Sequence, residues 1–227
     1  MITLDRRGWL AGAATALLAP RAAETQVRPR SQAMYDYLFL DLDGGPPGPA
    51  LAAKLKALPI AAGGGDVLGL FTPQLGWRAR QAAVLLRWSE AASGREAVVA
   101  SLGGERDRLT PTARPSPTDR PASGGIYVHR WFVIDTPALD EFVALSTEGW
   151  KDFETRFDTN IFGLFTAEPT AAERTAGRMR LLLVTRYASH GVWEASRDPS
   201  TAAMAAFARR QKLTRDTWAA STLLASA

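Results

Sequence analysis

The tetrapeptide Gly-Leu-Phe-Thr occurs twice in this 227-residue chain, at Gly69–Thr72 and again at Gly163–Thr166. A single repeated tetrapeptide can arise by chance. A true internal repeat is indicated only if other sequence features recur around both copies in the same order. Upstream of each copy, Tyr35–Asp43 (YDYLFLDLD) and Tyr127–Asp135 (YVHRWFVID) share their first and last residues and their aromatic positions. The two tetrapeptides therefore indicate two copies of one structural unit.

Further marks repeat in the same order. They are Pro-Ala-Leu at 49–51 and 137–139, the runs AVLLRW at 83–88 and LLVTRY at 182–187, and the pairs Arg106-Asp107 and Arg215-Asp216. The matching glycines, Gly69 and Gly163, predict a point in each unit where a neighbouring backbone approaches closely, because glycine inside a strand often serves that purpose.

The second copy has the clearer pattern of secondary structure. Residues 127–135, 160–168 and 179–187 are rich in β-branched and aromatic residues and predict strands. Pro137 opens a stretch with apolar residues at helical spacing, and Asp198-Pro199 suits the start of a second helix over 200–213. Residues 217–224 favour a short closing strand. The order β-α-β-β-α-β is that of the ferredoxin-like unit.

These patterns predict the division of the chain. The first ferredoxin-like unit covers 33–110, with a short second helix at 93–102, and the second covers 125–227. The Pro-rich stretch 111–124 is the linker between them. The fold class is therefore α+β.

A four-stranded sheet with helices on one face needs a cover for the other face. Two tandem units meet this need by packing sheet to sheet as an α+β barrel. Because side chains alternate along a strand, Tyr37, His129 and Trp131 are expected to face the space between the sheets, with Arg130 on the opposite face beside the helices.

The first 23 residues have the layout of a secretory signal peptide. Arg6-Arg7 precedes an apolar run from Leu10 to Ala19 that is too short to span a bilayer. The arginine pair followed by Gly-Trp-Leu is similar to a twin-arginine signal, although Asp5 and Trp9 depart from the usual residues. The expected location is the periplasm.

Composition excludes several classes of protein. Without residues 1–23, 24 basic and 22 acidic residues remain, which gives no argument for a nucleic-acid partner. The chain has no cysteine, which excludes disulfides and thiol nucleophiles, and it has no apolar run long enough for a membrane span.

The second copy resembles the NIPSNAP family of dimeric α+β barrels. The resemblance rests on Asp140-Glu141-Phe142, on the block 186–194 (RYASHGVWE) and on the ending FARRQKLTRDTWAASTLL, and it is strongest over 125–225. It implies the barrel fold and a cleft. The wider superfamily includes cofactor-free monooxygenases, haem enzymes and binding modules, and no catalytic motif of that superfamily can be carried over to this chain.

Seven residues are candidates for ligand contact. His129 and His190 are the two histidines, and neither has a partner at metal-ligand spacing, so we expect no metal site and no cofactor. The stretch 186–197 concentrates polar and aromatic side chains after a strand, where ligands are often bound. The candidates are Tyr37, His129, Trp131, Arg186, Tyr187, His190 and Trp193.

Each candidate also has a structural interpretation. His129 suits a satisfied core position, Trp193 suits a plug at the barrel end, and Arg186 suits an ion pair with Glu194 or Glu148. The sequence favours a small apolar or aromatic ligand bound between the sheets. The alternatives are a cofactor-independent oxygenase or isomerase that uses His129 with Tyr37 or Tyr187, and a structural or partner-binding module. No motif indicates the oligomeric state.

The signal-peptide prediction is tested by changing Arg6 and Arg7 to lysine. We expect the precursor to stay in the cytoplasm, because the twin-arginine pathway reads a guanidinium pair that lysine does not reproduce. Cell fractionation and immunoblotting measure the outcome. Undiminished periplasmic accumulation of the double variant would contradict the twin-arginine assignment.

Overall fold

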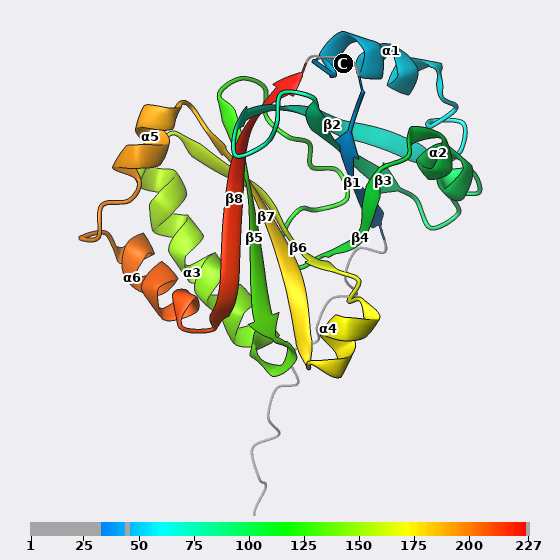
Figure 1. The fold of residues 1–227 in the computed structure, drawn as a ribbon. Coiled ribbons are helices and arrows are strands. Elements are labelled where there is room, and N and C mark those ends of the chain that lie inside the picture. The colour runs from blue at the N-terminus through cyan, green and yellow to red at the C-terminus, as the bar shows by residue number, and fades with distance from the viewer. Residues whose placement is uncertain (1–32, 44–45, 226–227) are drawn as a thin grey trace, which may run out of the picture.

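The computed structural model describes residues 33–43 and 46–225. The predicted signal peptide at 1–23 lies outside the described residues. In the described part, eight strands form one closed barrel in the order β1-β3-β2-β8-β5-β7-β6-β4. Helices α1 and α2 lie on one side of this barrel and α3, α5 and α6 on another (Figure 1).

The first half has the order β-α-β-β-α-β. Its elements are β1 (Met34–Asp41), α1 (Gly48–Ala57), β2 (Gly65–Leu75), β3 (Gln81–Trp88), α2 (Arg95–Leu102) and β4 (Glu105–Pro111). β1 lies between β3 and β4, and β3 also pairs with β2, all antiparallel. This is the ferredoxin-like strand arrangement.

The second half repeats that order with additions. Its elements are β5 (Ile126–Asp135), η1 (Thr136–Ala138), α3 (Leu139–Arg156), β6 (Thr159–Ala167), α4 (Ala171–Thr175), β7 (Arg178–Tyr187), α5 (His190–Ala195), α6 (Ala202–Gln211) and β8 (Thr214–Ala225). β5 lies between β7 and β8, and β7 also pairs with β6. The predicted α+β fold class of two ferredoxin-like units in one barrel is confirmed.

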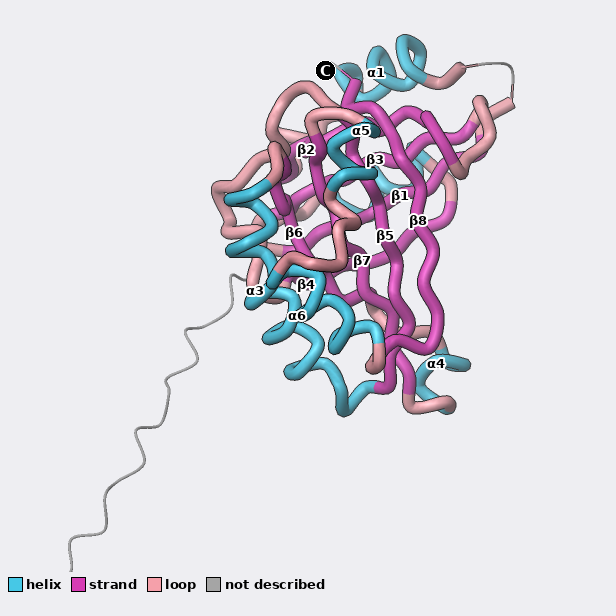
Figure 2. The backbone as a smooth tube through the Cα atoms, turned by 90° about the vertical axis from the view of Figure 1, so that its left-hand side faces the viewer, coloured by secondary structure: helices cyan, strands magenta, loops and turns pink. Residues whose placement is uncertain are grey.

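Two inter-half seams close the barrel. β2 pairs with β8 from Leu70 opposite Ala225 onward, and β4 pairs with β6 over a short stretch centred on Thr110 opposite Thr166. β8 lies beside β5 in both views of the molecule (Figure 1, Figure 2). Closure leaves neither four-stranded sheet with an open edge, which removes the main site of unwanted strand pairing.

The two halves agree in register around the repeated tetrapeptide. Phe71 lies opposite Ala83, and Phe165 lies opposite Leu182, which is the alignment that the sequence repeat predicts. The register of each second strand also shifts immediately before the glycine of GLFT, at Gly69 in β2 and at Gly163 in β6. A β-bulge is therefore part of the repeated unit.

The glycines are required by a side chain and not by an approaching backbone as expected. A Cβ on Gly69 would lie 2.6 Å from the ring of Phe71, and a Cβ on Gly163 would lie 2.8 Å from the ring of Phe165. Both phenylalanines are fully buried. In each half the phenylalanine ring folds back over the glycine two residues earlier, so the tetrapeptide encodes a packing motif of the barrel wall.

Three apolar clusters stabilise the fold. The first fills the barrel interior and includes Tyr35, Phe71, Tyr127 and Phe165. The other two lie between the sheets and the helices, under α1 and α2 in the first half and under α3 and α6 in the second. The alternation of strand side chains thus separates the barrel interior from the helix-facing layer, which is mostly aliphatic in the first half and rich in aromatic residues in the second.

The pairs Arg106-Asp107 and Arg215-Asp216 are each the second and third residues of a closing strand, β4 and β8, as their order predicts, although Asp107 lies opposite Tyr37 and Asp216 opposite Val133. Two other local predictions are wrong. The final helix is capped by Thr201, whose hydroxyl accepts from Met204 N, and Asp198 instead caps the preceding turn through Ser200 N. His190 begins the short helix α5 where a loop was expected.

Gly163→Ala tests the packing of the tetrapeptide. The new Cβ would also lie 2.6 Å from Pro115 Cδ, so both neighbours must move, and we expect a loss of about 1–3 kcal/mol in the free energy of unfolding. Denaturant titration measures it. Gly191→Ala is the control, because a Cβ there meets nothing closer than 3.6 Å and alanine favours a helix. Equal stabilities for the two variants would contradict the packing role.

Candidate functional site

The segment between β4 and β5 covers one end of the barrel. Arg87 donates to the carbonyls of Pro117 and Asp119, Arg186 donates to the carbonyl of Gly124 at 3.1 Å, and the Tyr127 hydroxyl donates to the carbonyl of Ala122. The two arginines belong to the repeated Arg-aromatic pairs at the ends of β3 and β7. Their repetition is therefore explained by this cover.

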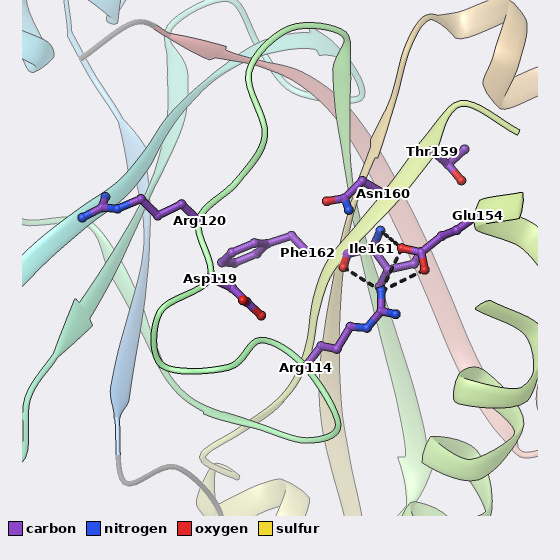
Figure 3. Close-up of a pocket in the computed structure, with 8 residues that line it drawn as sticks. All are labelled: Arg114, Asp119, Arg120, Glu154, Thr159, Asn160, Ile161 and Phe162. Carbon is purple, nitrogen blue, oxygen red and sulfur yellow. Dashed lines mark hydrogen bonds and ion pairs between the residues drawn. The ribbon is translucent and has the colours of Figure 1, made fainter. Parts of the chain in front are cut away.

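A polar pocket of about 520 Å³ lies beside the covering segment (Figure 3). Arg114 donates to both carboxylate oxygens of Glu154 at 2.8 and 2.9 Å, and the same carboxylate accepts from Ile161 N. Arg120 pairs with Asp66 at 2.6 Å. Because both arginines lining this pocket already have carboxylate partners, the pocket offers little free charge for binding a ligand.

The opposite end of the barrel is open and aromatic. A cavity of about 210 Å³ lies there, and its lining consists of Tyr37, Phe39, Trp77, Trp131 and Trp218 together with Glu105, Asp107 and Arg180. Trp131 and Trp218 stand opposite each other on β5 and β8, and their rings stack 6.1 Å apart. Trp218 is 45% exposed, so this wall of the cavity is accessible from solvent.

Trp77 comes from the turn between β2 and β3. It follows Gly76, whose φ of 90° is a conformation that favours glycine. The Trp77 ring meets Phe39 edge to face at 5.2 Å and lies 5.4 Å from the ring of His129. This turn therefore brings an aromatic wall over the barrel mouth and separates the cavity from the histidine behind it.

The charged groups at the mouth are unequally paired. Arg180 contacts Asp107 at 2.9 Å and Glu173 at 2.6 Å, and its guanidinium lies 5.4 Å from the centre of the Trp131 ring. The exposed carboxylate of Glu105 has no hydrogen bond or ion pair within the part of the chain that the structure describes. In the cavity lining, the two carboxylates of Glu105 and Asp107 against the one guanidinium of Arg180 give a negative balance.

Tyr37 connects the cavity to a buried histidine. Its hydroxyl forms a 2.9 Å hydrogen bond with His129 Nδ1, and the histidine is 1% exposed. His129 Nε2 has no hydrogen-bond partner among the described residues, and the Phe71 ring lies 4.5 Å from the imidazole. The pair joins β1 of one half to β5 of the other through the barrel interior.

Burial sets the protonation states of this pair. It lowers the pKa of His129 to about 3, because the imidazolium would lose its hydration in an apolar interior. Burial also raises the pKa of Tyr37 well above its ordinary value, and the nearby Asp107 carboxylate adds to this rise. At neutral pH the pair is therefore a neutral imidazole hydrogen-bonded to a neutral phenol.

The structure brings together three of the seven sequence candidates. Tyr37, His129 and Trp131 face the barrel interior as the strand period predicts, and Arg130 lies on the helix-facing side. Tyr187 and Trp193 belong instead to the cluster beneath α3 and α6. The candidates thus belong to separate regions of the barrel and do not form one site.

The other two candidates have structural partners. Arg186 lies at the covered end and pairs with Asp158 at 2.8 Å, so the expected pairing with Glu194 or Glu148 is wrong. Glu148 contacts Arg209. His190 Nε2 forms a 3.0 Å hydrogen bond with Ser221 Oγ on β8.

Sequence reasoning missed most of the mouth. Phe39 could have been predicted to line the mouth, because the repeat alignment pairs it with Trp131. No sequence pattern indicated Trp77, Trp218 or Arg180. Trp218 and Arg180 lie beside Trp131 within one sheet, and closure of the barrel brings Trp77 to them from the other half. Within the described residues, no group of three or more histidine, aspartate or glutamate side chains is placed to hold a metal ion. That same part of the chain contains no helix suited to crossing a membrane.

No family model and no curated protein matches the sequence. Solved structures with the same fold include a candidate monooxygenase from Lactobacillus acidophilus NCFM, with a TM-score of 0.51 at 8% identity, covering 86% of this chain and 96% of that one. A second candidate monooxygenase, from Fusobacterium nucleatum, has a TM-score of 0.50 at 10% identity and covers 86% and 91%. An anthrone oxidase-like protein has a TM-score of 0.52 at 11% identity, with the same coverage. At these identities the likeness establishes the ferredoxin-like α+β barrel fold.

The burial of His129 predicts a pH-dependent stability. The unfolded chain binds a proton at this residue below its ordinary pKa of 6.5, and the folded chain does so only below about 3. The contribution of the neutral imidazole to the free energy of unfolding is complete above pH 6.5. It is lost as the pH falls below that value, at about 1.4 kcal/mol per pH unit. Between about pH 6.5 and 4.5 we expect this residue alone to remove about 2–3 kcal/mol from the free energy of unfolding.

Urea titrations at several pH values compare the wild type with His129→Gln. We expect the variant to lose much less stability over this range, while His190→Gln, the matched control, retains the wild-type slope. Identical slopes for the wild type and His129→Gln would show that the imidazole is not held neutral by burial.

Proposed function

We propose that this protein binds a small planar aromatic molecule at the open end of its barrel. The observation that supports this most directly is the convergence of five aromatic side chains on one cavity of about 210 Å³, including a stacked tryptophan pair. The cavity lies below the range of about 300–1,000 Å³ that is usual for drug-sized ligands, so the ligand is small. Aromatic surfaces of this kind favour offset or edge-to-face contact with another ring.

The charges at the mouth favour a neutral or cationic ligand. An anionic group would have to displace Asp107 or Glu173 from Arg180, which both contact within 3 Å. A cation, by contrast, would meet the tryptophan faces and the unpaired carboxylate of Glu105, and both attract positive charge.

The ligand site that we propose differs in position from the one that the sequence favours. The interior between the sheets is filled by buried aromatic residues such as Tyr35, Phe71 and Tyr127. The cavity is lined by Tyr37 and Trp131 but not by His129. Binding is therefore proposed at the mouth, where the filled interior forms its floor.

A second candidate function is oxygenation of the bound aromatic molecule without a cofactor. The 2.9 Å hydrogen bond between Tyr37 and His129 favours it, because Tyr37 reaches the cavity and a neutral imidazole behind it can accept a proton through the phenol. The structural likeness to candidate monooxygenases and to an anthrone oxidase-like protein is consistent with this chemistry. A pKa of about 3 makes His129 a weak base, however, and for that reason binding is our primary proposal.

We also propose that the protein is exported to the periplasm and is of the NIPSNAP type. The arginine pair at 6–7 and the apolar run after it support export. The block 186–194 and the chain ending support the NIPSNAP assignment, together with the shared α+β barrel fold. The remaining alternative is a partner-binding module, for which the aromatic mouth would be the contact surface.

Calorimetry with three probes of one ring system tests the binding proposal. Indole is neutral, tryptamine is a cation and indole-3-acetate is an anion, so the series separates ring recognition from charge. We expect indole and tryptamine to bind at the mouth and indole-3-acetate to bind at least several-fold more weakly, because the negative balance opposes it.

Trp218→Ala removes one half of the stacked pair at an exposed position and is expected to weaken indole binding by about tenfold. Leu223→Ala is the matched control, because Leu223 is 39% exposed on the same strand and does not line the cavity. Failure of all three probes to bind, or equal effects of the two substitutions, would contradict the proposal.

A further inference from the structure

Three arginines on the helix-facing side of β5 have no carboxylate partner. Arg130 comes from β5, Arg197 from the connection between α5 and α6, and Arg210 from α6. No ion pair joins any of them to an acidic residue within the described part of the chain. On α3, Asp152 pairs with Arg156 and Glu148 with Arg209. Asp198 accepts from Ser200 N, and Glu194, exposed on α5, forms no ion pair with Arg197 among the described residues.

Arg210 is the most deeply placed of the three. Arg210 is only 7% exposed. Its guanidinium carbon lies 4.5 to 5.3 Å from the ring centres of Phe207, Phe132 and Phe142. The one hydrogen bond that its guanidinium makes among the described residues runs from Nη1 to Ser146 Oγ at 3.1 Å. Contacts with aromatic faces offset part of the cost of burying this charge, but they leave most of its N–H donors without an acceptor.

The other two arginines are more accessible. Arg130 is half-buried beside Phe132 on β5, and Arg197 is exposed with its guanidinium 5.7 Å from the centre of the Trp193 ring. Arg210 lies over Phe132, two residues from Arg130 on β5, and each of the three guanidinium groups interacts electrostatically with the other two. Burial, together with the charges of Arg130 and Arg197, lowers the pKa of Arg210 to about 9. Burial and then Arg197 likewise lower the pKa of Arg130.

In the first half of the chain, by contrast, a buried charge has partners of the opposite sign. Asp36 is fully buried on the helix-facing side of β1 and contacts Arg95 at 2.9 Å and Arg106 at 2.7 Å. Two guanidinium groups there share one carboxylate from the chain. In the second half the buried guanidinium of Arg210 has no carboxylate partner among the described residues, and an anion from outside them would stabilise it.

We propose that Arg130, Arg197 and Arg210 form a binding site for a small oxyanion, with a phosphate group as the best-fitting class. Guanidinium groups match the geometry of phosphate oxygens and bind them with charge-assisted hydrogen bonds. A doubly charged anion also cancels more of the mutual repulsion than a singly charged carboxylate does. The accessible pair, Arg130 and Arg197, admits the anion, and the buried Arg210 forms the base of the site.

This site is independent of the aromatic mouth. Arg130 and Trp131 are neighbours on β5, and their side chains point to opposite faces of the sheet. An oxyanion bound beside Arg130 would therefore lie outside the barrel wall, between β5 and the helices, while the aromatic ligand would lie at the mouth.

Thermal unfolding in inorganic phosphate tests the proposal. At about 50 mM phosphate we expect the Tm of the wild-type chain to rise by several degrees above its value in sodium chloride of equal ionic strength, because the anion binds only the folded state. Glycerol phosphate is measured in parallel. A larger rise with glycerol phosphate identifies an organic phosphate as the ligand, and an equal rise identifies the free anion.

Two single variants and one control locate the effect. Arg130→Gln and Arg197→Gln are expected to lose more than half of the phosphate-dependent rise, and without phosphate neither should melt much below the wild type, since each removal relieves repulsion. Arg209→Gln, on the same helix as Arg210 but paired with Glu148, should keep the full rise. No rise beyond that of sodium chloride, or an equal loss in the Arg209 variant, would overturn the proposal.

Discussion

The structure depends on one constraint, which is that each four-stranded sheet carries helices on one face and must have its other face covered. In this chain the cover for each sheet is the other sheet, and strand pairing at two seams, β2 with β8 and β4 with β6, closes the two into one barrel. Closure places Tyr35, Phe71, Tyr127 and Phe165 in a common interior. Everything proposed about the mouth depends on this closure, because its lining residues come from both halves.

The two ends of the barrel differ because the chain crosses only one of them. The segment between the halves must run from β4 to β5, and the repeated arginines at the ends of β3 and β7 bind its carbonyl groups. The opposite end carries the turn with Trp77 and the β6–β7 connection with α4, and the cavity there stays accessible beside the exposed Trp218. Tandem fusion thus provides a reason for an asymmetric barrel with one covered end and one open end.

The sequence predicted the fold well because its repeat is marked by residues with strict packing needs. Gly69 and Gly163 tolerate no side chain beneath Phe71 and Phe165, so the tetrapeptide preserved the register of the bulge in both halves. Strand alternation likewise placed Tyr37 and His129 in the interior. The mouth was harder to predict, because Trp218 and Arg180 come from the strands on either side of β5, and Trp77, from the first half, joins them only through closure.

Hydrogen–deuterium exchange at the two seams tests the closed barrel most directly. If the halves are joined as described, hydrogen-bonded backbone amides of β2 facing β8 and of β4 facing β6 will exchange as slowly as those within each half, through global unfolding. Fast exchange confined to the seam amides, with the remaining strand amides protected, would show that the halves separate and would contradict the account of a single closed barrel.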